Sequence, residues 1–388
     1  MMQKVLFIQY TNSAAFPPLE HISRILANGG WQALFLSVSA PGLESLRFPP
    51  HERIETRQMP YCPPGWRQKT HYAWFTLWSL WWTLCWRPRW VYASDLFSCP
   101  AALLMSFVPG VRVVYHEHDS PASSSGSLFV TLSLAARRRL ARRAKVCVLP
   151  NRRRADKFDR EVRKPSSNGH RPSMVVWNCP SLEELSAPRP AHDGGDLWVL
   201  YHGSIVPPRL PLPVLEALAR LPERVRLCVI GYETIGHRGY VGELREAAER
   251  LGIGSRVTFP GALADRKELL AWCRRCDVGL AFMPKVSEDI NMLAMVGASN
   301  KPFDYLSRGL ALLVSDLPDW RATYVETGYG LACDPNEPES IAGALGWFLD
   351  HPIEMRAMGE RGRRKIAEEW NYENQFSPVL GRMDAAVK

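Results

Sequence analysis

Residues 289–321, DINMLAMVGASNKPFDYLSRGLALLVSDLPDWR, predict a loop, a helix, a sharp stop and a buried strand. Ser299 or Asn300 can cap the helix, and Gly309 ends it. The apolar run 310–314 that follows is typical of a strand covered on both faces. Free N–H groups and the helix dipole both favour negative charge at a helix N-terminus, so the stretch is a candidate anion site. An ordinary loop–helix–strand connection would give the same local pattern.

The same alternation of short apolar strands with helices continues outward from this stretch in both directions. In the second half, the expected strands cover 198–202, 225–231, 256–259, 278–282, 311–315 and 330–332. In the first half, they cover 4–10, 32–38, 90–93, 111–115, 146–150 and 175–177. Strands that alternate with helices favour parallel sheets, so we expect an α/β chain with two doubly wound, Rossmann-like domains.

A stretch rich in Pro, Ala, Gly and acidic residues separates the two halves. This composition is typical of a linker, so we expect a first domain at 1–182, a linker at 183–196 and a second domain at 197–371. Ligands of doubly wound sheets gather at the carboxyl ends of the strands. Gly203 and Gly231 both follow strands of the second half, where they would let backbone approach a ligand.

Polar side chains follow strands in the first half as well. Asn12 and Ser13 lie after the first strand, and His116, Glu117 and His118 follow a buried strand. Titratable groups at such a strand end are more typical of an active site than of a core. Their spacing gives no zinc site without a third ligand. Neither half has a GxGxxG or a P-loop pattern, which disfavours dinucleotide oxidoreductases and P-loop enzymes.

The charge is divided unevenly along the chain. Residues 1–180 hold 24 Lys and Arg against 10 Asp and Glu, whereas residues 181–388 hold 24 against 29. The basic first half therefore indicates an anionic partner. Nine cysteines show no disulfide framework, and the pair Cys273 and Cys276 lacks the further ligands of a zinc site. We interpret them as core residues suited to a reducing cytoplasm, and the apolar N-terminus as a first strand rather than a secretory signal.

Two features of the first half could meet a membrane. Residues 70–86, THYAWFTLWSLWWTLCW, contain five tryptophans and no Asp, Glu, Lys or Arg. A buried helix, a helix that also touches a bilayer interface and a membrane span are all open interpretations. The run from Arg137 to Lys164 is dense in arginine, as a solvated face or a site for anionic headgroups would be. We expect an anionic membrane surface to bind the Trp74–Trp86 helix and the Arg137–Lys164 patch. Nucleic acid is disfavoured, because the aromatic residues lie apart from the arginines.

Several runs of the second half resemble the retaining glycosyltransferases of family 4, which have the GT-B fold. These runs are VLYHGS (199–204) with Arg209, LCVIGYE (227–233), RVTFPGAL (256–263), CDVGLAF (276–282) and, above all, NKPFDYLSRGLALLVSDLPDW (300–320). NYENQF (371–376) is similar to the family's closing segment, whose last helix crosses back to the first domain. The resemblance therefore implies that residues 372–388 pack on the first domain, and that donor binding belongs to the second.

The resemblance also implies roles for individual residues. Asp304 would hold the donor ribose, and Arg209 and Lys301 would lie at the donor diphosphate. The expected donor-binding set is Gly203, Arg209, Gly231, Tyr232, Ser299, Asn300, Lys301 and Asp304. The expected catalytic residues are His116 and Glu117, and the expected acceptor-side residues are Asn12, Ser13 and His118. Val296 and Ser204 depart from the family pattern, which has Glu and Arg at these positions.

The implied reaction moves a sugar from a nucleotide diphosphate sugar to an acceptor with retention, and it requires no metal or other cofactor. The basic, tryptophan-rich first half favours a glycan or lipid-linked acceptor of bacterial polysaccharide or glycolipid synthesis. We therefore expect a cytoplasmic enzyme that is peripheral on the inner face of the cell membrane. The alternatives are a non-catalytic nucleotide-sugar or carbohydrate-binding protein on the same fold, and a GT-B enzyme with a soluble acceptor.

Overall fold

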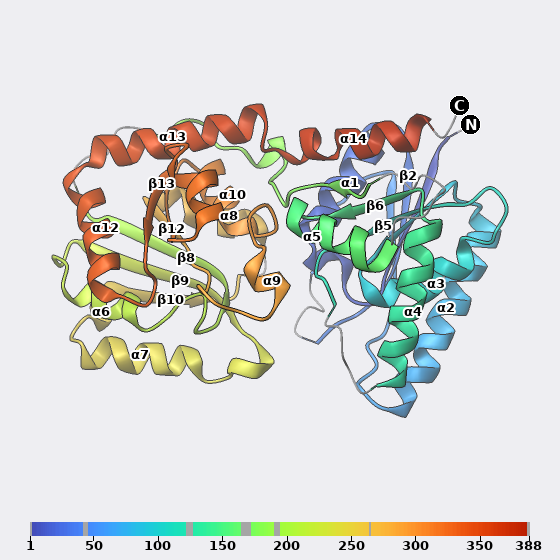
Figure 1. Cartoon of the computed structure of the whole chain (residues 1–388), viewed down its shortest axis with the longest axis horizontal. Coiled ribbons are helices and arrows are strands. Elements are labelled where there is room, and N and C mark those ends of the chain that lie inside the picture. Colours follow the sequence, from blue (N-terminus) through green and yellow to red (C-terminus); the bar gives the residue numbers. More distant parts are fainter. Residues whose placement is uncertain are drawn as a thin grey trace. The chain divides into compact units, whose positions relative to one another are not determined.

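The computed structural model describes residues 2–41, 46–121, 127–163, 172–189, 195–263 and 265–385. The chain divides into two compact units, and Figure 1 shows their elements in sequence colours. Unit 1 comprises residues 1–178 and 372–388, and unit 2 comprises residues 179–371. Each unit contains one parallel sheet with helices, so the expected pair of doubly wound, Rossmann-like domains is confirmed.

Unit 1 is built on a seven-stranded parallel sheet in the order β3-β2-β1-β4-β5-β6-β7. Its strands are β1 (Lys4–Gln9), β2 (Gln32–Val38), β3 (Ile54–Met59), β4 (Trp90–Ser94), β5 (Arg112–His116), β6 (Val146–Leu149) and β7 (Met174–Val175). Strand β1 alternates its side chains between two apolar cores, with Leu6 and Ile8 in one and Val5 and Phe7 in the other. Both faces are covered, which explains why the central strands are apolar without interruption.

Two groups of helices cover this sheet. Helices α2 (Trp66–Trp86), α3 (Cys99–Met105) and α4 (Leu128–Arg143) form one layer, with α2 against α3 and α3 against α4 (Figure 1). Helix α5 (Arg152–Phe158) and a π-helical turn, Asp159–Arg163, follow β6. Helices α1 (Pro17–Asn28) and α14 (Tyr372–Ala385) contact each other and share the other core. Within the described ranges, no helix is both long and apolar enough to cross a bilayer.

Unit 2 is built on a six-stranded parallel sheet in the order β10-β9-β8-β11-β12-β13. Its strands are β8 (Leu197–Ile205), β9 (Val225–Glu233), β10 (Val257–Gly261), β11 (Val278–Ala281), β12 (Ala311–Ser315) and β13 (Gly330–Cys333). Its helices are α6 (Pro213–Ala219), α7 (Tyr240–Arg250), α8 (Arg266–Arg275), α9 (Ile290–Leu293), α10 (Asn300–Ser307), α11 (Pro318–Trp320), α12 (Pro338–Asp350) and α13 (Pro352–Glu368). One large apolar cluster joins α6, α7 and α12 to the sheet.

Helix α10 is buried along almost its whole length. Every residue from Lys301 to Ser307 is buried. The ring of Tyr305 lies over Gly279 of β11, where any Cβ would come within 2.2 Å of it. Its hydroxyl donates to the carbonyl oxygen of Leu280 at 3.2 Å and accepts from the backbone N–H of His202 at 3.1 Å. This side chain therefore fixes α10 against two neighbouring strands of the sheet.

The segment expected to be a linker belongs to unit 2. Its start forms a 3-10 turn at Leu182–Glu184, and Glu184 pairs with Arg266 at 2.5 Å. The backbone N–H of Ser186 donates to the carbonyl oxygen of Ser307 at 3.2 Å. These contacts join residues far apart in sequence, so a Pro- and Ala-rich composition could not reveal them. Residues 190–194 of the expected linker lie outside the described residues.

Candidate active site

Two glycines shape the carboxyl ends of β8 and β9. Gly203 and Gly231 are partners in the strand register, with φ angles of +106° and +149° that favour glycine. A Cβ on Gly231 would lie 1.8 Å from the carbonyl oxygen of Gly203. A Cβ on Gly203 would lie 3.0 Å from Lys301 Nζ. The backbone of β8 and the ammonium group of Lys301 therefore face the same small space.

Lys301 is a buried cation at the start of α10. Burial, and secondly nearby Arg209, lower the pKa of its ammonium group from 10.5 to about 7, against an opposing effect of Asp304. No ion pair reaches its Nζ from the described residues of unit 2. Burial makes the charged form of Lys301 unfavourable when no anion is near. A bound anion would stabilise that charged form and would itself be stabilised by the positive charge.

Arg209 supplies a second cation. Its Nη1 donates to Ser204 Oγ at 3.1 Å, and its Nη2 contacts Met292 Sδ at 3.5 Å. Its Nε is buried and has no hydrogen-bond partner within the described part of the chain. A guanidinium with a sulfur and a hydroxyl as partners retains capacity for a stronger acceptor, such as a phosphate oxygen.

The N-terminus of α10 faces no side-chain cap. Ser299 is the N-cap residue with extended backbone angles, but its hydroxyl makes no capping hydrogen bond. Ser299 is buried and Asn300 is half-buried. The first N–H groups of a helix lack partners inside the helix and carry partial positive charge. The helix start, Lys301 and Arg209 therefore give one edge of unit 2 a concentrated positive potential, as the anion-site interpretation of this stretch requires.

Asp304 has a partner that the sequence did not indicate. Arg266 contacts both carboxylate oxygens, at 2.7 Å from Nη2 to Oδ1 and 3.4 Å from Nη1 to Oδ2. The same guanidinium also binds Glu184, and His202 Nε2 lies 3.5 Å from Asp304 Oδ2. Burial, then Lys301 and Arg266, hold the pKa of His202 well below its ordinary value, so this ring is neutral. Asp304 is thus the centre of a buried polar network whose members come from three distant segments.

Tyr232 lies at the end of β9, beside Gly231, and its ring is 59% exposed. The structure therefore brings the expected donor residues of unit 2 to one edge of the sheet, at the carboxyl ends of its strands. Arg266 and Glu184 are additions that only long-range packing could reveal. Val296, where the resembling family has a glutamate, lies between α9 and α10.

In unit 1, His116 and His118 form a neutral pair. Their ring centroids are 3.9 Å apart, and His116 Nδ1 shares a 2.7 Å hydrogen bond with the hydroxyl of Tyr92. Burial lowers the pKa of His116 well below its ordinary value, and lowers that of His118 to about 4. His116 Nε2 and both ring nitrogens of His118 have no partner within the described residues of unit 1. The pair can accept or donate hydrogen bonds to a polar ligand, but it carries no charge near neutral pH.

Asp95 joins this cluster, although the sequence interpretation omitted it. Its Oδ1 accepts from the backbone N–H of His118 at 2.8 Å, and its Oδ2 accepts from Gln9 Nε2 at 3.2 Å. Burial raises its pKa to about 7, against the lowering effect of the His118 hydrogen bond. Its φ of +62° is uncommon for a residue other than glycine. A signal was available, because Asp95 directly follows the buried strand β4.

Glu117 points away from the histidines, and its expected catalytic role stays a prediction. Its carboxylate is buried and makes a bidentate ion pair with Arg137, at 2.5 Å from Nε to Oε2 and 2.7 Å from Nη2 to Oε1. Tyr115 donates a further hydrogen bond to Oε2 at 2.7 Å. Successive residues of a strand point to opposite faces of the sheet, which is why Glu117 turns away from its neighbours. These contacts hold the Glu117 carboxylate in place inside unit 1.

The two expected acceptor-side residues of the first loop differ. Asn12 Oδ1 accepts from the backbone N–H of Ala14 at 3.0 Å, and Asn12 Nδ2 donates to the carbonyl oxygen of Leu46 at 3.4 Å. The amide of Asn12 therefore holds its own loop. The hydroxyl of Ser13 is buried, with no partner in the described part of the chain.

The arginine-rich run is partly internal, which corrects the patch predicted from sequence. Arg137, Arg154 and Arg163 are buried. Arg154 donates to the carbonyl oxygen of His118 at 2.9 Å, and Arg163 donates to that of Ala141 at 3.1 Å. The remaining arginines of the run are exposed, and Lys164 lies outside the described residues.

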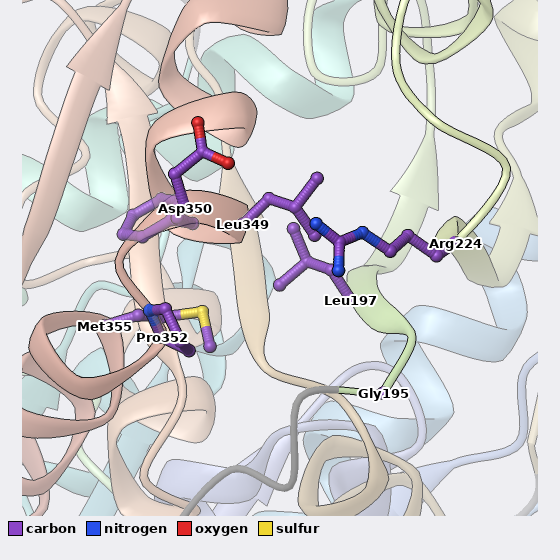
Figure 2. A pocket seen from close by; sticks show the side chains of 8 residues that line it. Gly195, Leu197, Arg224, Leu349, Asp350, Pro352 and Met355 are labelled. Atoms are coloured by element: carbon purple, nitrogen blue, oxygen red, sulfur yellow. The ribbon is translucent and has the colours of Figure 1, made fainter.

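The cysteines form no metal cluster within the described residues. Cys273 and Cys276 are buried thiols whose pKa burial raises, and no cluster of three metal-ligating side chains occurs in the described ranges. Figure 2 shows a cavity of about 280 Å³ in unit 2, near the first residue of β8 and the chain before β9. Its lining residues are Gly195, Leu197, Arg224, Phe348, Leu349, Asp350, Pro352 and Met355. These positions are at the amino ends of the strands, opposite the edge that holds Lys301.

A comparison with known protein families gives a match in the second half of the chain. Residues 183–365 match the family described as glycosyl transferases group 1. A D-inositol 3-phosphate glycosyltransferase of Xylanimonas cellulosilytica is 24% identical over 190 residues, which are 49% of this chain and 42% of that protein. The match thus spans less than half the length of this relative.

Solved structures resemble the whole chain. Sucrose-phosphate synthase of Thermosynechococcus elongatus has a TM-score of 0.73 at 15% identity, with both chains covered completely. Anabaena HepE in complex with UDP and glucose has a TM-score of 0.69 at 16% identity, over 99% of this chain and 100% of that one. The chain therefore has the GT-B fold, and its residues 183–365 match the glycosyl transferases group 1 family.

Proposed function

We propose that the protein is a glycosyltransferase that binds a nucleotide diphosphate sugar at the carboxyl edge of the unit 2 sheet. The observation that carries this proposal is the convergence of Lys301, Arg209 and the start of α10 beside Gly203. Two cations without a carboxylate of their own, next to uncapped helix N–H groups, fit a diphosphate. The group 1 domain that contains all of these residues supports the same assignment.

In the proposed reaction, the bond between the anomeric carbon and the diphosphate oxygen breaks. A new bond forms from that carbon to an acceptor hydroxyl oxygen, and the hydroxyl proton leaves with the diphosphate. Negative charge grows on the leaving diphosphate, where Lys301 and Arg209 stabilise it more strongly than in the ground state. This scheme assigns no step to a metal ion. Retention of configuration is part of the proposal, and the family resemblance of residues 300–320 supports it.

We assign the remaining roles in the same way. Gly203 and Gly231 are proposed to keep the strand ends open to the diphosphate, and Tyr232 and Asn300 are proposed to contact the nucleoside or sugar. Asp304, held by Arg266, is the proposed ribose ligand. His116 and His118, as neutral hydrogen-bonding groups, are proposed to contact the reacting sugars.

The acceptor is proposed to be a glycan or lipid-linked molecule at the cytoplasmic face of the cell membrane. The net positive charge of residues 1–180 supports this choice over a soluble neutral acceptor. A non-catalytic nucleotide-sugar binding protein is the second candidate, because Val296 and Ser204 replace residues that the family uses at the donor.

Calorimetric titration with UDP, GDP and ADP tests the donor site. At least one diphosphate should bind the wild-type protein, and Lys301→Met and Arg209→Gln should each weaken binding by more than about tenfold. Lys267→Met, which removes an exposed cation of α8, is the matched control and should bind normally. Absence of binding by every diphosphate contradicts the donor-site assignment.

Turnover separates an enzyme from a binding protein. Labelled nucleotide sugar should yield labelled product with lipid extracts as acceptor, and NMR of the product should show the anomeric configuration of the donor. Diphosphate binding without transfer to any lipid or soluble glycan pool would favour the second candidate. Transfer to soluble glycans alone would contradict the proposed acceptor class, and an inverted anomer would contradict retention.

A further inference from the structure

Helix α2 exposes several large apolar side chains. Its buried residues are Tyr72, Phe75, Ser79 and Thr83, so two hydroxyl groups lie beside two aromatic rings on the inner side. Four of its exposed positions are large and apolar: Trp74 at 61%, Leu77 at 58%, Trp81 at 54% and Leu84 at 53%. Surface helices usually turn apolar residues to the core and polar ones to water. Helix α2 departs from this rule, because it also turns large apolar side chains outward, to a side that is suited to an apolar environment.

The exposed apolar residues of α2 form one continuous stripe. Positions 74, 77, 81 and 84 are spaced by three or four residues, so they share one face of the helix. The indole rings are amphipathic and prefer the boundary between hydrocarbon and headgroups. A stripe of this kind suits a helix that lies flat in the plane of a bilayer interface.

The neighbouring helices of this layer also expose large apolar side chains. Leu128 and Leu132 on α4 are 72% and 59% exposed, and Leu104 and Phe107 at the end of α3 are 48% and 62% exposed. The contacts from α2 to α3 and from α3 to α4 make these helices one layer on the sheet (Figure 1). Scattered apolar residues are common on protein surfaces, but a group on one layer indicates an interaction site.

The charges of this layer are all of one sign. Residues 66–86, 99–105 and 128–143 contain seven Lys and Arg and no Asp or Glu. Of the arginines, Arg138, Arg139 and Arg142 are exposed on α4, whereas Arg137 is committed to its internal ion pair. Exposed cations beside an apolar stripe complement the negative headgroups and the hydrocarbon edge of an anionic leaflet.

We propose that the outer face of α2, α3 and α4 is a docking surface for an anionic phospholipid bilayer. A second copy of the chain would oppose cations to cations, which is unfavourable. Nucleic acid would not match an apolar stripe that includes leucines and is separate from the arginines. A bilayer supplies both an apolar layer and negative charge. The docking surface rests on the proposed function, because it is where the enzyme would meet a membrane-bound acceptor.

Vesicle sedimentation with the full chain tests the docking surface. The wild-type protein should bind phosphatidylcholine vesicles that contain phosphatidylserine, and should bind pure phosphatidylcholine at least about tenfold more weakly. Replacing Trp74, Leu77, Trp81 and Leu84 with Gln should reduce binding more than about tenfold, since Gln keeps helix propensity but removes apolar contact. Arg138→Gln, Arg139→Gln and Arg142→Gln should each reduce binding about fivefold, and should weaken its salt dependence.

Matched controls carry the same chemical changes away from the layer. Ile353→Gln replaces a residue that is 81% exposed in unit 2, and Arg250→Gln and Arg364→Gln remove exposed cations there. These variants should bind vesicles like the wild type. Brominated lipids should quench the tryptophan fluorescence of the wild type but quench the stripe variant less.

Other outcomes overturn the proposal. If vesicles with and without phosphatidylserine bind equally poorly, or if stripe and control variants lose binding alike, the surface is not a lipid site. If the wild type self-associates without lipid and the stripe variant does not, the occupant is a second copy. Calorimetric titration with a diphosphate is run in parallel. If a diphosphate binds but vesicles do not, the docking-surface proposal is wrong and the proposed transferase function still stands.

Discussion

Proton uptake by Lys301 on diphosphate binding offers a test of the donor site. Its ammonium group has a pKa of about 7 in the folded protein, below its ordinary value of 10.5, mainly because of burial and secondly because of Arg209. A bound diphosphate would favour the charged form and raise this pKa. We therefore predict that diphosphate binding takes up a proton at Lys301, about half a proton at pH 7 and nearly one at pH 8.5.

The affinity should depend on pH accordingly. With a pKa of about 7, the charged fraction of Lys301 falls from about one half at pH 7 to about 3% at pH 8.5. The diphosphate affinity should fall about 15-fold over this interval if the charged form alone binds well. His202 does not titrate in this range, since its pKa lies well below the ordinary histidine value. The chosen interval also lies above the second phosphate pKa of about 6, so the ligand changes little.

The same shift predicts an effect on stability without ligand. The folded pKa lies below the unfolded one, so the native state binds fewer protons between about pH 7 and pH 10.5, and stability rises with pH across that window. At pH 7, the buried ammonium group costs about 4 kcal/mol relative to the unfolded chain. Lys301→Met should therefore increase the free energy of unfolding at pH 7 by up to about 4 kcal/mol, while it weakens diphosphate binding.

Calorimetry in two buffers with different ionisation enthalpies measures the proton uptake, and urea unfolding measures the stability. Lys301→Arg keeps the charge at all pH values tested, so its affinity should be independent of pH between 7 and 8.5. Lys267→Met should behave like the wild type in every measurement. Equal affinity of the wild type at pH 7 and pH 8.5, with no buffer-dependent heat, would refute the reasoning.

Three further changes test other parts of the structure. Glu117→Gln leaves the guanidinium of Arg137 buried without its carboxylate, so the free energy of urea unfolding should fall by about 3–5 kcal/mol. Adding Arg137→Met to the same chain should restore most of this loss. If the double variant shows no recovery, the ion pair is not the dominant effect. Gly231→Ala places a Cβ 1.8 Å from a carbonyl oxygen and should lower the free energy of unfolding by more than about 2 kcal/mol. Gly343→Ala lies in open space within a helix and should raise it by about 0.5–1 kcal/mol. Similar shifts of the melting temperature for the two variants would refute the steric argument. Ser79→Ala removes a buried hydroxyl that lacks a partner within the described residues and should raise the free energy of unfolding by about 1 kcal/mol, so a lowered melting temperature would contradict this.

Much of the fold could be predicted from sequence because buried parallel strands are short apolar runs between helices. This rule located β8, β9, β11 and β12 and the helix start at Ser299. It missed β3, whose residues IETRQM are mostly exposed at the sheet edge and lack the apolar signal. Local periodicity reports burial, and an edge strand is held by backbone pairing instead.

The candidate site divides in the same way. The sequence alone determined a parallel α/β fold and a cationic helix start, because strand periodicity, capping and glycine stops act over a few residues. Tertiary structure alone decided that Glu117 turns inward to Arg137 while His116 and His118 pair, and that Arg266 reaches Asp304 across 38 residues. It also decided that α2 shows Trp74 and Trp81 to solvent and Ser79 to the core. The direction of a side chain depends on what packs against each face, and those neighbours come from distant segments that no local pattern specifies.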